Sequence, residues 1–343
     1  MQTKGDLKTM KHLLLLGTGG TIACKRGENG LTPLLTGDEL LSYVPDAKKF
    51  CEVETVQVLN IDSTNMHPKH WLKLAQVLEE NYDDYDGFVI CHGTDTMAYT
   101  AAAMSYLVQH SSKPIVITGA QKPIDLDVTD ARTNLLDSLR FAASERAHGV
   151  TIVFDGKVIA GTRGKKERTK SYNAFSSINF PYIATIQDEH ILFYLDDKEL
   201  VREPVSFCHT MDWKVGLLKL IPALDAAVLD YMAEHYDAVI IESFGVGGLP
   251  NYEGASYHKA VEKWISQGKT VVMTTQVTNE GSNMSVYEVG RTIKYEFGLL
   301  ESYDMTLEAT VTKLMWILGQ THDRAKVKEM FYRTVNHDIL WKA

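Results

Sequence analysis

The fold is decided by residues 87–118, whose sequence is GFVICHGTDTMAYTAAAMSYLVQHSSKPIVIT. An apolar run at 87–91 leads through a short loop into an alanine-rich stretch at 97–109, and a second apolar run follows at 114–118. Short apolar runs bounded by turn residues are typical of buried strands. The stretch therefore predicts a strand, a helix and a second, parallel strand joined by a right-handed crossover.

The same alternation extends in both directions along the chain. Further strands are expected at 12–16, 53–59 and 149–154, and further helices at 68–82 and 129–145. Between 158 and 197 the helical spacing stops, so short strands and turns are expected there. The pattern predicts an α/β fold in which helices flank a mostly parallel sheet.

A second, smaller α/β unit is expected after a charged stretch that contains Pro204. Its predicted strands are 215–220, 238–241 and 270–274, and its predicted helices are 224–234, 256–266, 306–318 and 323–334. A single core seldom grows beyond about 250–300 residues, so the chain length also favours two domains. We expect an N-terminal domain at 1–200, a linker at 201–214 and a C-terminal domain at 215–343.

The composition argues against several classes of protein. The formal net charge of −9 opposes binding to nucleic acid or to anionic lipid. The four cysteines form no C-x-x-C pair, which gives no sign of a zinc site and suits a reducing compartment. No apolar stretch reaches the roughly 18–20 residues of a membrane span, and the N-terminus has no signal-peptide core. We therefore expect a cytoplasmic protein that binds neither membrane nor nucleic acid.

Two loops at strand ends carry hydroxyl groups, and the first belongs to residues 13–23, LLLLGTGGTIA. Glycines after a buried strand let the backbone approach a ligand closely. A dinucleotide-binding turn is one interpretation, but Ile22 stands where that motif needs a small residue. Two other interpretations stay open from this loop alone: a loop that presents Thr21 to a substrate, and a simple glycine turn.

The second loop places Thr94 and Asp95 directly after the strand at 87–91. Both are common helix-capping residues, so capping alone would explain them. Ligands of parallel sheets bind at the carboxyl ends of the strands, where both loops are expected. Threonines in two loops at one sheet edge therefore favour a catalytic site.

A threonine hydroxyl is a good nucleophile only when a nearby base takes its proton, and a basic run offers lysines for this role. The run consists of Arg163, Lys165, Lys166, Arg168 and Lys170. Lowering a lysine pKa by about three units costs about 4 kcal/mol, and a neighbouring carboxylate opposes the shift. We therefore favour a lysine that relays a proton while Asp95 balances its charge; a solvated basic loop is the alternative.

Ser63 and Thr64 follow the second expected strand and precede a helix, so they belong to the same edge. A hydroxyl beside a helix N-terminus suits a carboxylate ligand, and helix capping is the alternative. His67 and His70 lie three residues apart with no third ligand near them in the sequence, and we interpret them as surface or capping residues. We expect no metal ion and no organic cofactor.

Together these residues resemble the type I, cytoplasmic-type bacterial L-asparaginases, and the likeness runs along almost the whole chain. It rests on TGGTIA at 18–23, GFVICHGTDTMA at 87–98 and DMTLEATVTKL at 304–314. The resemblance implies that Thr21 is the first catalytic threonine and that Thr94, Asp95 and Lys166 form a second catalytic set. Lys166 is chosen over Lys165 by its distance from the Gly-Thr-Arg motif at 161–163.

The resemblance also implies how the substrate is held. Ser63 matches the residue that binds the α-carboxylate, Asp95 the residue that binds the α-ammonium, and Thr64 a further polar contact. One departure concerns the loop after the first signature, where the family usually has a tyrosine and this chain has Leu31. Tyr287 is a candidate replacement for that tyrosine.

The implied activity is hydrolysis of the side-chain amide of L-asparagine to L-aspartate and ammonia, with minor activity on glutamine. The implied assembly is a homodimer or homotetramer, and some members bind asparagine at a second, allosteric site. Two alternatives remain. A non-catalytic amino-acid sensor on the same scaffold would fit the missing tyrosine. The glutaminase subunit of a tRNA-dependent amidotransferase is less favoured, because it carries an extra N-terminal domain and needs an RNA-binding surface.

Overall fold

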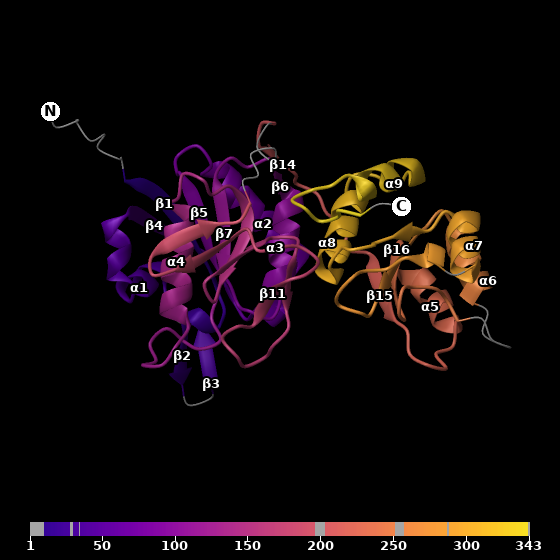
Figure 1. Ribbon diagram of the computed structural model, residues 1–343, viewed down its shortest axis with the longest axis horizontal. Helices are drawn as coiled ribbons and strands as arrows, with labels where there is room; N and C mark the ends of the chain where they lie inside the picture. Colours follow the sequence, from indigo (N-terminus) through magenta and orange to yellow (C-terminus); the bar gives the residue numbers. More distant parts are fainter. Residues whose placement is uncertain are drawn as a thin grey trace.

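The computed structural model describes residues 10–27, 30–33, 35–195, 203–250, 257–286 and 288–341. They form two α/β domains, each built on its own sheet (Figure 1). The larger sheet has eight strands and belongs to the N-terminal domain, and the smaller has four strands and belongs to the C-terminal domain. None of the helices in these ranges has the length and apolar character that crossing a bilayer requires.

The larger sheet is mostly parallel, which confirms the predicted fold class. Its strands in spatial order are β13 (His190–Phe193), β12 (Ala184–Gln187), β9 (Lys157–Ala160), β8 (Gly149–Phe154), β7 (Pro114–Thr118), β5 (Gly87–Cys91), β1 (Lys11–Gly19) and β4 (Cys51–Ile61). The neighbours from β8 to β4 pair in parallel, and β9, β12 and β13 extend the sheet with antiparallel pairs. The carboxyl ends of the parallel strands therefore share one edge.

Helices cover both faces of this sheet because its central strands are apolar on both sides. They are α1 (Gly37–Ser42), α2 (Pro68–Glu80), α3 (Met97–Leu107) and α4 (Ala131–Ala142). In β1, Leu14 and Leu16 lie in the core with α2 and α3, while Leu13 and Leu15 lie in the core with α1 and α4. Successive side chains of a strand point to opposite faces, so one apolar run supplies both layers.

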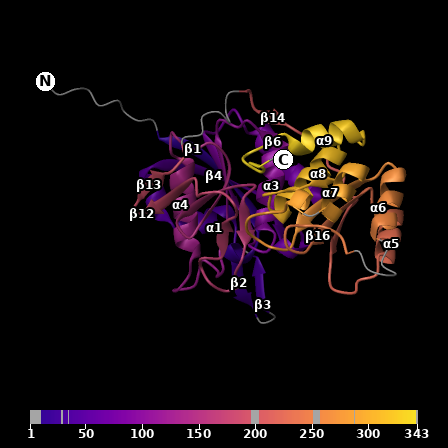
Figure 2. The same cartoon turned by 45° about the vertical axis from the view of Figure 1, so that its right-hand side comes forward.

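The C-terminal domain repeats this plan on a smaller scale. Its parallel strands are β15 (Val215–Lys219), β16 (Ala238–Ser243), β17 (Thr270–Thr275) and β18 (Leu300–Glu301), and its helices are α5 (Ala227–His235), α6 (Tyr257–Ser266), α7 (Glu288–Phe297), α8 (Leu307–Leu318) and α9 (Arg324–Tyr332). In β17, Val271 packs with α5 and α6, whereas Val272 joins the core that contains α8 and α9. That core also includes α3, so it runs without a break from one domain into the other (Figures 1 and 2).

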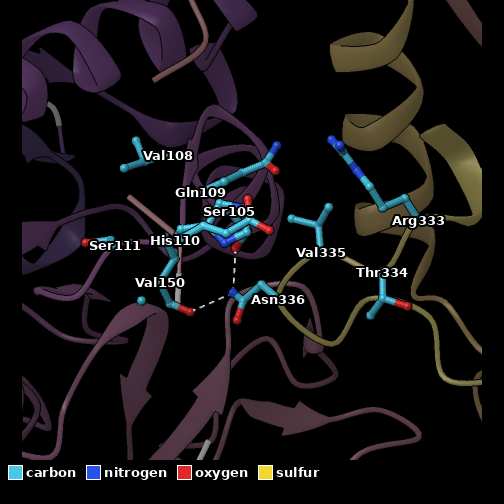
Figure 3. A pocket seen from close by; sticks show the side chains of 12 residues that line it. Ser105, Val108, Gln109, His110, Ser111, Val150, Arg333, Thr334, Val335 and Asn336 are labelled. Carbon is cyan, nitrogen blue, oxygen red and sulfur yellow. Dashed lines mark hydrogen bonds and ion pairs between the residues drawn. The ribbon is translucent and has the colours of Figure 1, made fainter. Parts of the chain in front are cut away.

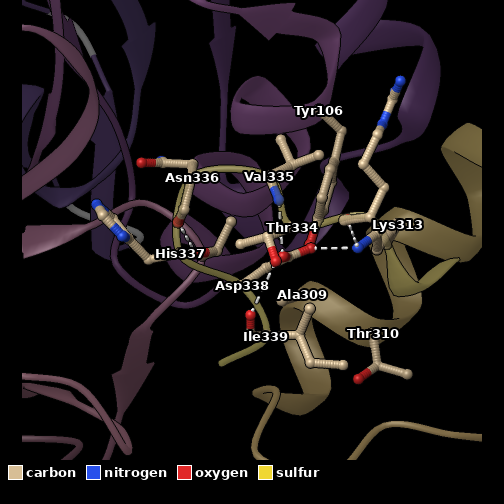
Figure 4. Close-up of polar contacts among 12 residues, drawn as sticks. Tyr106, Ala309, Thr310, Lys313, Thr334, Val335, Asn336, His337, Asp338 and Ile339 are labelled. Carbon is tan, nitrogen blue, oxygen red and sulfur yellow. Dashed lines mark hydrogen bonds and ion pairs between the residues drawn. The ribbon is translucent and has the colours of Figure 1, made fainter. Parts of the chain in front are cut away.

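A fully buried ion pair reinforces this junction between the domains. Lys313 of α8 lies 2.6 Å from a carboxylate oxygen of Asp338, and both side chains are 0% exposed. Tyr106 of α3 donates its hydroxyl to the same carboxylate at 2.9 Å, and the backbone N–H of Val335 donates to its other oxygen (Figure 4). Residues 334–341 therefore connect α3 of one domain with α8 of the other.

Several elements differ from the expectation or were missed. The helix expected at 97–109 ends at Leu107, because β6 (Val108–Gln109) is extended and pairs with β14 (Ser206–Phe207). The hairpin of β2 (Cys24–Gly27) and β3 (Gly30–Pro33) and the helices α1 and α7 were not expected. Figure 2 shows this hairpin projecting from the N-terminal domain, and β2 begins three residues after Thr21.

We expect Lys313→Met to lower the free energy of unfolding by about 3–5 kcal/mol, because it leaves the Asp338 carboxylate buried without its cation. Urea denaturation followed by circular dichroism measures the change. Lys263→Met is the matched control, because Lys263 pairs with Asp230 at 2.7 Å while both side chains are half exposed. That surface pair should contribute less than about 1 kcal/mol. Equal losses in the two variants would contradict the assigned role of the buried pair.

Candidate active site

The two threonine loops are in direct contact. The strands β1 and β5 are neighbours with Gly17 opposite Cys91, and the Thr18 hydroxyl donates to the Cys91 carbonyl at 2.8 Å. Gly20, which has a φ of +76°, approaches the backbone of Gly93 so closely that a Cβ on it would overlap that backbone. Only glycine combines this φ with this approach. The residues that follow these two glycines, Thr21 and Thr94, are therefore brought to one place.

A third loop joins them from β4. A Cβ on Gly93 would lie 2.6 Å from the Ser63 hydroxyl oxygen, and Ser63 is 3% exposed. Thr96 fixes this loop by donating its hydroxyl to the Ser63 carbonyl at 2.7 Å. Thr64 differs from Ser63 because its side chain is exposed and donates to Asp62 at 2.9 Å. The structure thus brings Ser63 against Gly93, whereas the Thr64 side chain of the same loop is exposed.

Lys166 completes a hydrogen-bonded set with Thr94 and Asp95. Its ammonium group donates to the Thr94 hydroxyl oxygen at 2.8 Å and to an Asp95 carboxylate oxygen at 2.6 Å. The Lys166 side chain is 16% exposed, whereas the Asp95 side chain is 57% exposed. The Lys166 amine is therefore mostly buried and donates to two acceptors. One of them, the Asp95 carboxylate, is exposed to solvent. Thr21, which directly follows Gly20, is partly exposed.

Strand alternation separates Lys166 from its neighbour Lys165. Both belong to β10 (Gly164–Lys166), which pairs with β11 (Phe175–Ser177) in a two-stranded sheet. Adjacent side chains of a strand point to opposite faces. Lys165 acts electrostatically on Glu308, whose pKa is raised by burial while the Lys165 charge opposes the rise. The two lysines thus have different surroundings, and Lys166 is the one that reaches Thr94.

The structure also brings Gln121, which sequence reasoning missed, to the Thr94 hydroxyl. The Gln121 side-chain oxygen accepts from Thr94 at 3.4 Å, and its amide nitrogen donates to the carbonyls of Arg168 and Ser171. Gln121 follows β7, the strand next to β5. Its place at the carboxyl end of an expected strand was the signal that could have found it.

His92 lies next to Gly93 in the second loop, and its side chain is 0% exposed. One ring nitrogen lies 2.6 Å from the Gly93 carbonyl and the other 2.9 Å from the Thr100 hydroxyl, which accepts from the Trp71 indole N–H at 2.9 Å. A carbonyl only accepts, so Nδ1 of His92 must carry the proton that faces Gly93. Burial lowers the pKa of His92 to about 4, against the opposing effect of the Gly93 bond.

Other predicted residues lie elsewhere. The ring of His67 accepts from Lys69, and that of His70 accepts from the His67 backbone, so the pair caps α2, which confirms their interpretation as capping residues. The Leu31 side chain and Tyr287 lie outside the described residues. Within the described ranges, no group of three or more histidine, cysteine or acidic side chains has a geometry that would hold a metal ion.

A cavity of about 230 Å³ is distinct from this site. It is lined by residues of the α3 to β7 connection, the start of β8 and residues 333–336, so it lies at the amino ends of the strands. Figure 3 shows Asn336 on its wall, where its amide donates to the Ser105 hydroxyl and the Val150 carbonyl. The threonine loops lie at the opposite sheet edge.

Two family models cover most of the chain. Residues 12–199 match the model of the asparaginase N-terminal domain, and residues 214–331 match that of the glutaminase/asparaginase C-terminal domain. The chain belongs to the asparaginase family. This membership confirms the resemblance inferred from the two signatures and from residues 304–314.

Relatives of this asparaginase-family chain match over nearly its full length. The L-asparaginase of Thermococcus kodakarensis is 38% identical over 95% of this chain and 98% of its own, and the L-asparaginase 1 of Escherichia coli K12 is 30% identical over 96% and 98%. A subunit of the glutamyl-tRNA(Gln) amidotransferase of Pyrococcus abyssi is 36% identical over 94% of this chain and 75% of its own.

Solved structures agree with the fold. The thermostable L-asparaginase from Thermococcus kodakarensis superimposes with a TM-score of 0.91 at 36% identity, covering 96% of this chain and 100% of that one. The L-asparaginase I from Vibrio cholerae superimposes with a TM-score of 0.86 at 28% identity, covering 97% and 100%. The asparaginase architecture is therefore shared by both domains.

We expect His92 of this asparaginase-family chain to stay a neutral Nδ1–H tautomer above about pH 5, because its folded pKa of about 4 lies below the ordinary 6.5. Its contribution to stability is then complete above pH 6.5 and is lost as the pH falls toward 4. Imidazole ¹⁵N chemical shifts, assigned with His92→Gln, measure both tautomer and titration. A midpoint near 6.5 or an Nε2–H tautomer would contradict this arrangement.

Proposed function

We propose that this protein is an L-asparagine amidohydrolase that releases ammonia through a threonine nucleophile. The contact of Lys166 with Thr94 and Asp95 carries the proposal, because it joins a hydroxyl, an amine and a carboxylate where the two threonine loops meet. Such a set can move protons during acyl transfer. The asparaginase relatives support the substrate.

In the proposed reaction, the Thr21 oxygen attacks the side-chain carbonyl carbon of asparagine and loses its proton. Backbone N–H groups near Thr94 stabilise the negative charge that develops on the carbonyl oxygen. The carbon–nitrogen bond then breaks, and the leaving nitrogen takes a proton and departs as ammonia. Water hydrolyses the ester on Thr21, which regenerates the hydroxyl and releases aspartate. Thr94, Lys166 and Asp95 carry the protons between these steps.

The geometry favours Lys166 as a charged proton relay over a neutral base. The Lys166 amine donates to an Asp95 carboxylate oxygen at 2.6 Å and to the Thr94 oxygen at 2.8 Å. A cation at that position stabilises negative charge on Thr94 when its proton leaves toward the leaving group or water. The Gln121 oxygen accepts the Thr94 proton in the resting arrangement.

The charges around the site suit a free amino acid. The exposed carboxylate of Asp95 can bind an α-ammonium group, as the family resemblance implies. Ser63, packed against Gly93 at the start of a short 3-10 helix, can donate to the α-carboxylate. Thr64 is assigned a supporting polar contact on the same loop. Fixing both ends of the amino acid would bring its side-chain amide to Thr21.

The glutaminase subunit of a tRNA-dependent amidotransferase is the second candidate, because the amidotransferase relative is 36% identical to this chain, which is close to the identity of the asparaginases. Asparagine and glutamine differ by one methylene, which a pocket distinguishes by only about 1–3 kcal/mol. We assign minor glutaminase activity on that ground. We further propose a cytoplasmic homodimer or homotetramer, as the family resemblance implies.

Ammonia release from asparagine and glutamine, measured with and without glutamylated tRNA, tests these proposals together. We expect release from asparagine that exceeds release from glutamine and does not depend on tRNA, because the chain is acidic and its site fits a free amino acid. Release from glutamine alone, stimulated by tRNA, would establish the amidotransferase function instead. Binding of asparagine without ammonia release would establish a sensor.

Substitutions of Thr21, Thr94 and Lys166 should lower the reaction rate without unfolding the protein. We expect Thr21→Ala, Thr94→Val and Lys166→Met each to lower kcat by at least about a hundredfold, because each removes a group that reacts or moves a proton. Lys165→Met is the matched control, since it removes the same charge from the adjacent position and should keep most of the activity. Steady-state ammonia release and circular dichroism measure rate and fold. Loss of activity in Lys165→Met but not in Lys166→Met would show that Lys165, and not Lys166, moves the proton.

A further inference from the structure

Arg163 is the largest charged side chain buried without any exposure in the described part of the chain. Its guanidinium donates to the Asp304 carbonyl and to the Asp304 carboxylate, both at 2.7 Å, and to the His337 carbonyl at 2.6 Å. These acceptors all belong to the C-terminal half of the chain, although Arg163 follows β9 of the large sheet. Arg163 therefore extends from one domain into the other.

Asp304 is itself fixed by several donors. Its carboxylate accepts from the backbone N–H groups of Leu340 and Trp341 at 3.1–3.2 Å, in addition to the guanidinium. A buried charge is tolerated only when it is paired and its remaining hydrogen-bonding groups are satisfied. The Arg163–Asp304 pair meets this requirement, so its geometry is closely determined.

The residue before Arg163 is held in the same way. The Thr162 hydroxyl donates to the Asn336 carbonyl at 2.5 Å, and the Thr162 carbonyl accepts from the Thr306 hydroxyl at 2.9 Å. Thr306 is also the N-cap of α8 and accepts from the Ala309 N–H at 3.0 Å. The backbone at 162–163 is thereby attached to the first turn of α8 and to residues 334–341.

Lys166 lies three residues beyond this attachment. Its strand β10 has three residues and pairs only with β11 among the described strands, so the large sheet does not hold it in register. The Ile178 N–H donates to the Arg163 carbonyl at 2.9 Å, which closes the base of the β10–β11 hairpin on the same residue. The position of the Lys166 amine therefore depends on Thr162 and Arg163.

We propose that Arg163 and Asp304 are positioning residues, through which the C-terminal domain sets the place of the Lys166 amine against Thr94 and Asp95. The inference rests on the proposed asparaginase reaction, in which Lys166 moves protons. Neither residue contacts Thr94 or Asp95, and both act through the backbone at 162–166. A displacement of about 1 Å in a reacting group can reduce a rate by about a hundredfold.

The experiment compares Arg163→Met and Asp304→Asn with the control Lys313→Met. The control removes a cation from an equally buried pair at the same domain junction, but its partner Asp338 makes no hydrogen bond to residues 162–166. Asp304→Asn is the milder variant, because its amide can still accept from Arg163. For each variant we measure kcat and KM for asparagine, the dependence of kcat on pH, and the midpoint of thermal unfolding.

We expect Arg163→Met to lower kcat by about 30- to 100-fold and Asp304→Asn by about 5- to 30-fold, with KM changed less than about threefold. The pH dependence of kcat should also shift in both, because the contact of Lys166 with Asp95 is altered. Lys313→Met should lower the unfolding midpoint by a comparable amount and leave kcat and the pH profile unchanged at temperatures where it is folded. Arg163→Lys should restore only part of kcat, since one ammonium nitrogen cannot reach all the acceptors that the guanidinium bonds through three separate nitrogens.

Folded Asp304→Asn protein with wild-type kcat and pH profile would overturn the proposal. A loss of kcat in Lys313→Met as large as that in Asp304→Asn would also overturn the proposal. The decrease in kcat would then result from lower stability alone. If Arg163→Met does not fold, the comparison of Asp304→Asn with Lys313→Met decides the question. Failure of the proposed function is a separate result, because the wild-type protein would then release no ammonia from asparagine.

Discussion

The close approach of the Gly20 and Gly93 backbones is the constraint on which the site depends. The strands β1 and β5 are neighbours in a parallel sheet, so their loops leave the same edge about one strand spacing apart. Side chains at these two positions would force the loops apart. Without them the backbones touch, and the next residues of both loops, Thr21 and Thr94, share one region. The sheet thus fixes the proposed reacting groups through its own hydrogen-bond register.

The proposed proton-transfer group, Lys166, is supplied differently. Lys166 comes from a hairpin outside the large sheet, and the base of this hairpin is attached to Asp304, Thr306 and residues 336–337. The core that contains α3 and α8 runs through the same junction between the two domains. The C-terminal domain gives no side chain to the set of Thr94, Asp95 and Lys166. In our proposal it nevertheless helps to hold the set in place.

The sequence predicted what local patterns determine. The strands at 87–91, 114–118 and 149–154 were predicted at their observed ends, because they are short apolar runs between turn residues. Helix α7 was missed, although Val289, Ile293 and Phe297 recur at a helical spacing of four residues. The pairing of Arg163 with Asp304 joins residues 141 apart, and no local pattern reports such a contact. Gln121 was missed for a related reason: its place after an expected strand is the one local signal, and its contact with Thr94 follows only from how the neighbouring loop is placed.

The sequence alone does not distinguish the surroundings of Lys165 from those of Lys166. Two adjacent lysines have the same composition, charge and pKa in an unfolded chain, and only the pleat of β10 gives them different neighbours. One acts on the buried Glu308, and the other donates to Thr94 and Asp95. The bonds to Asp95 and Thr94 hold the Lys166 amine in a fixed position. In the proposed reaction, that fixed position suits the amine for proton relay, because proton transfer requires a donor and an acceptor within hydrogen-bond reach.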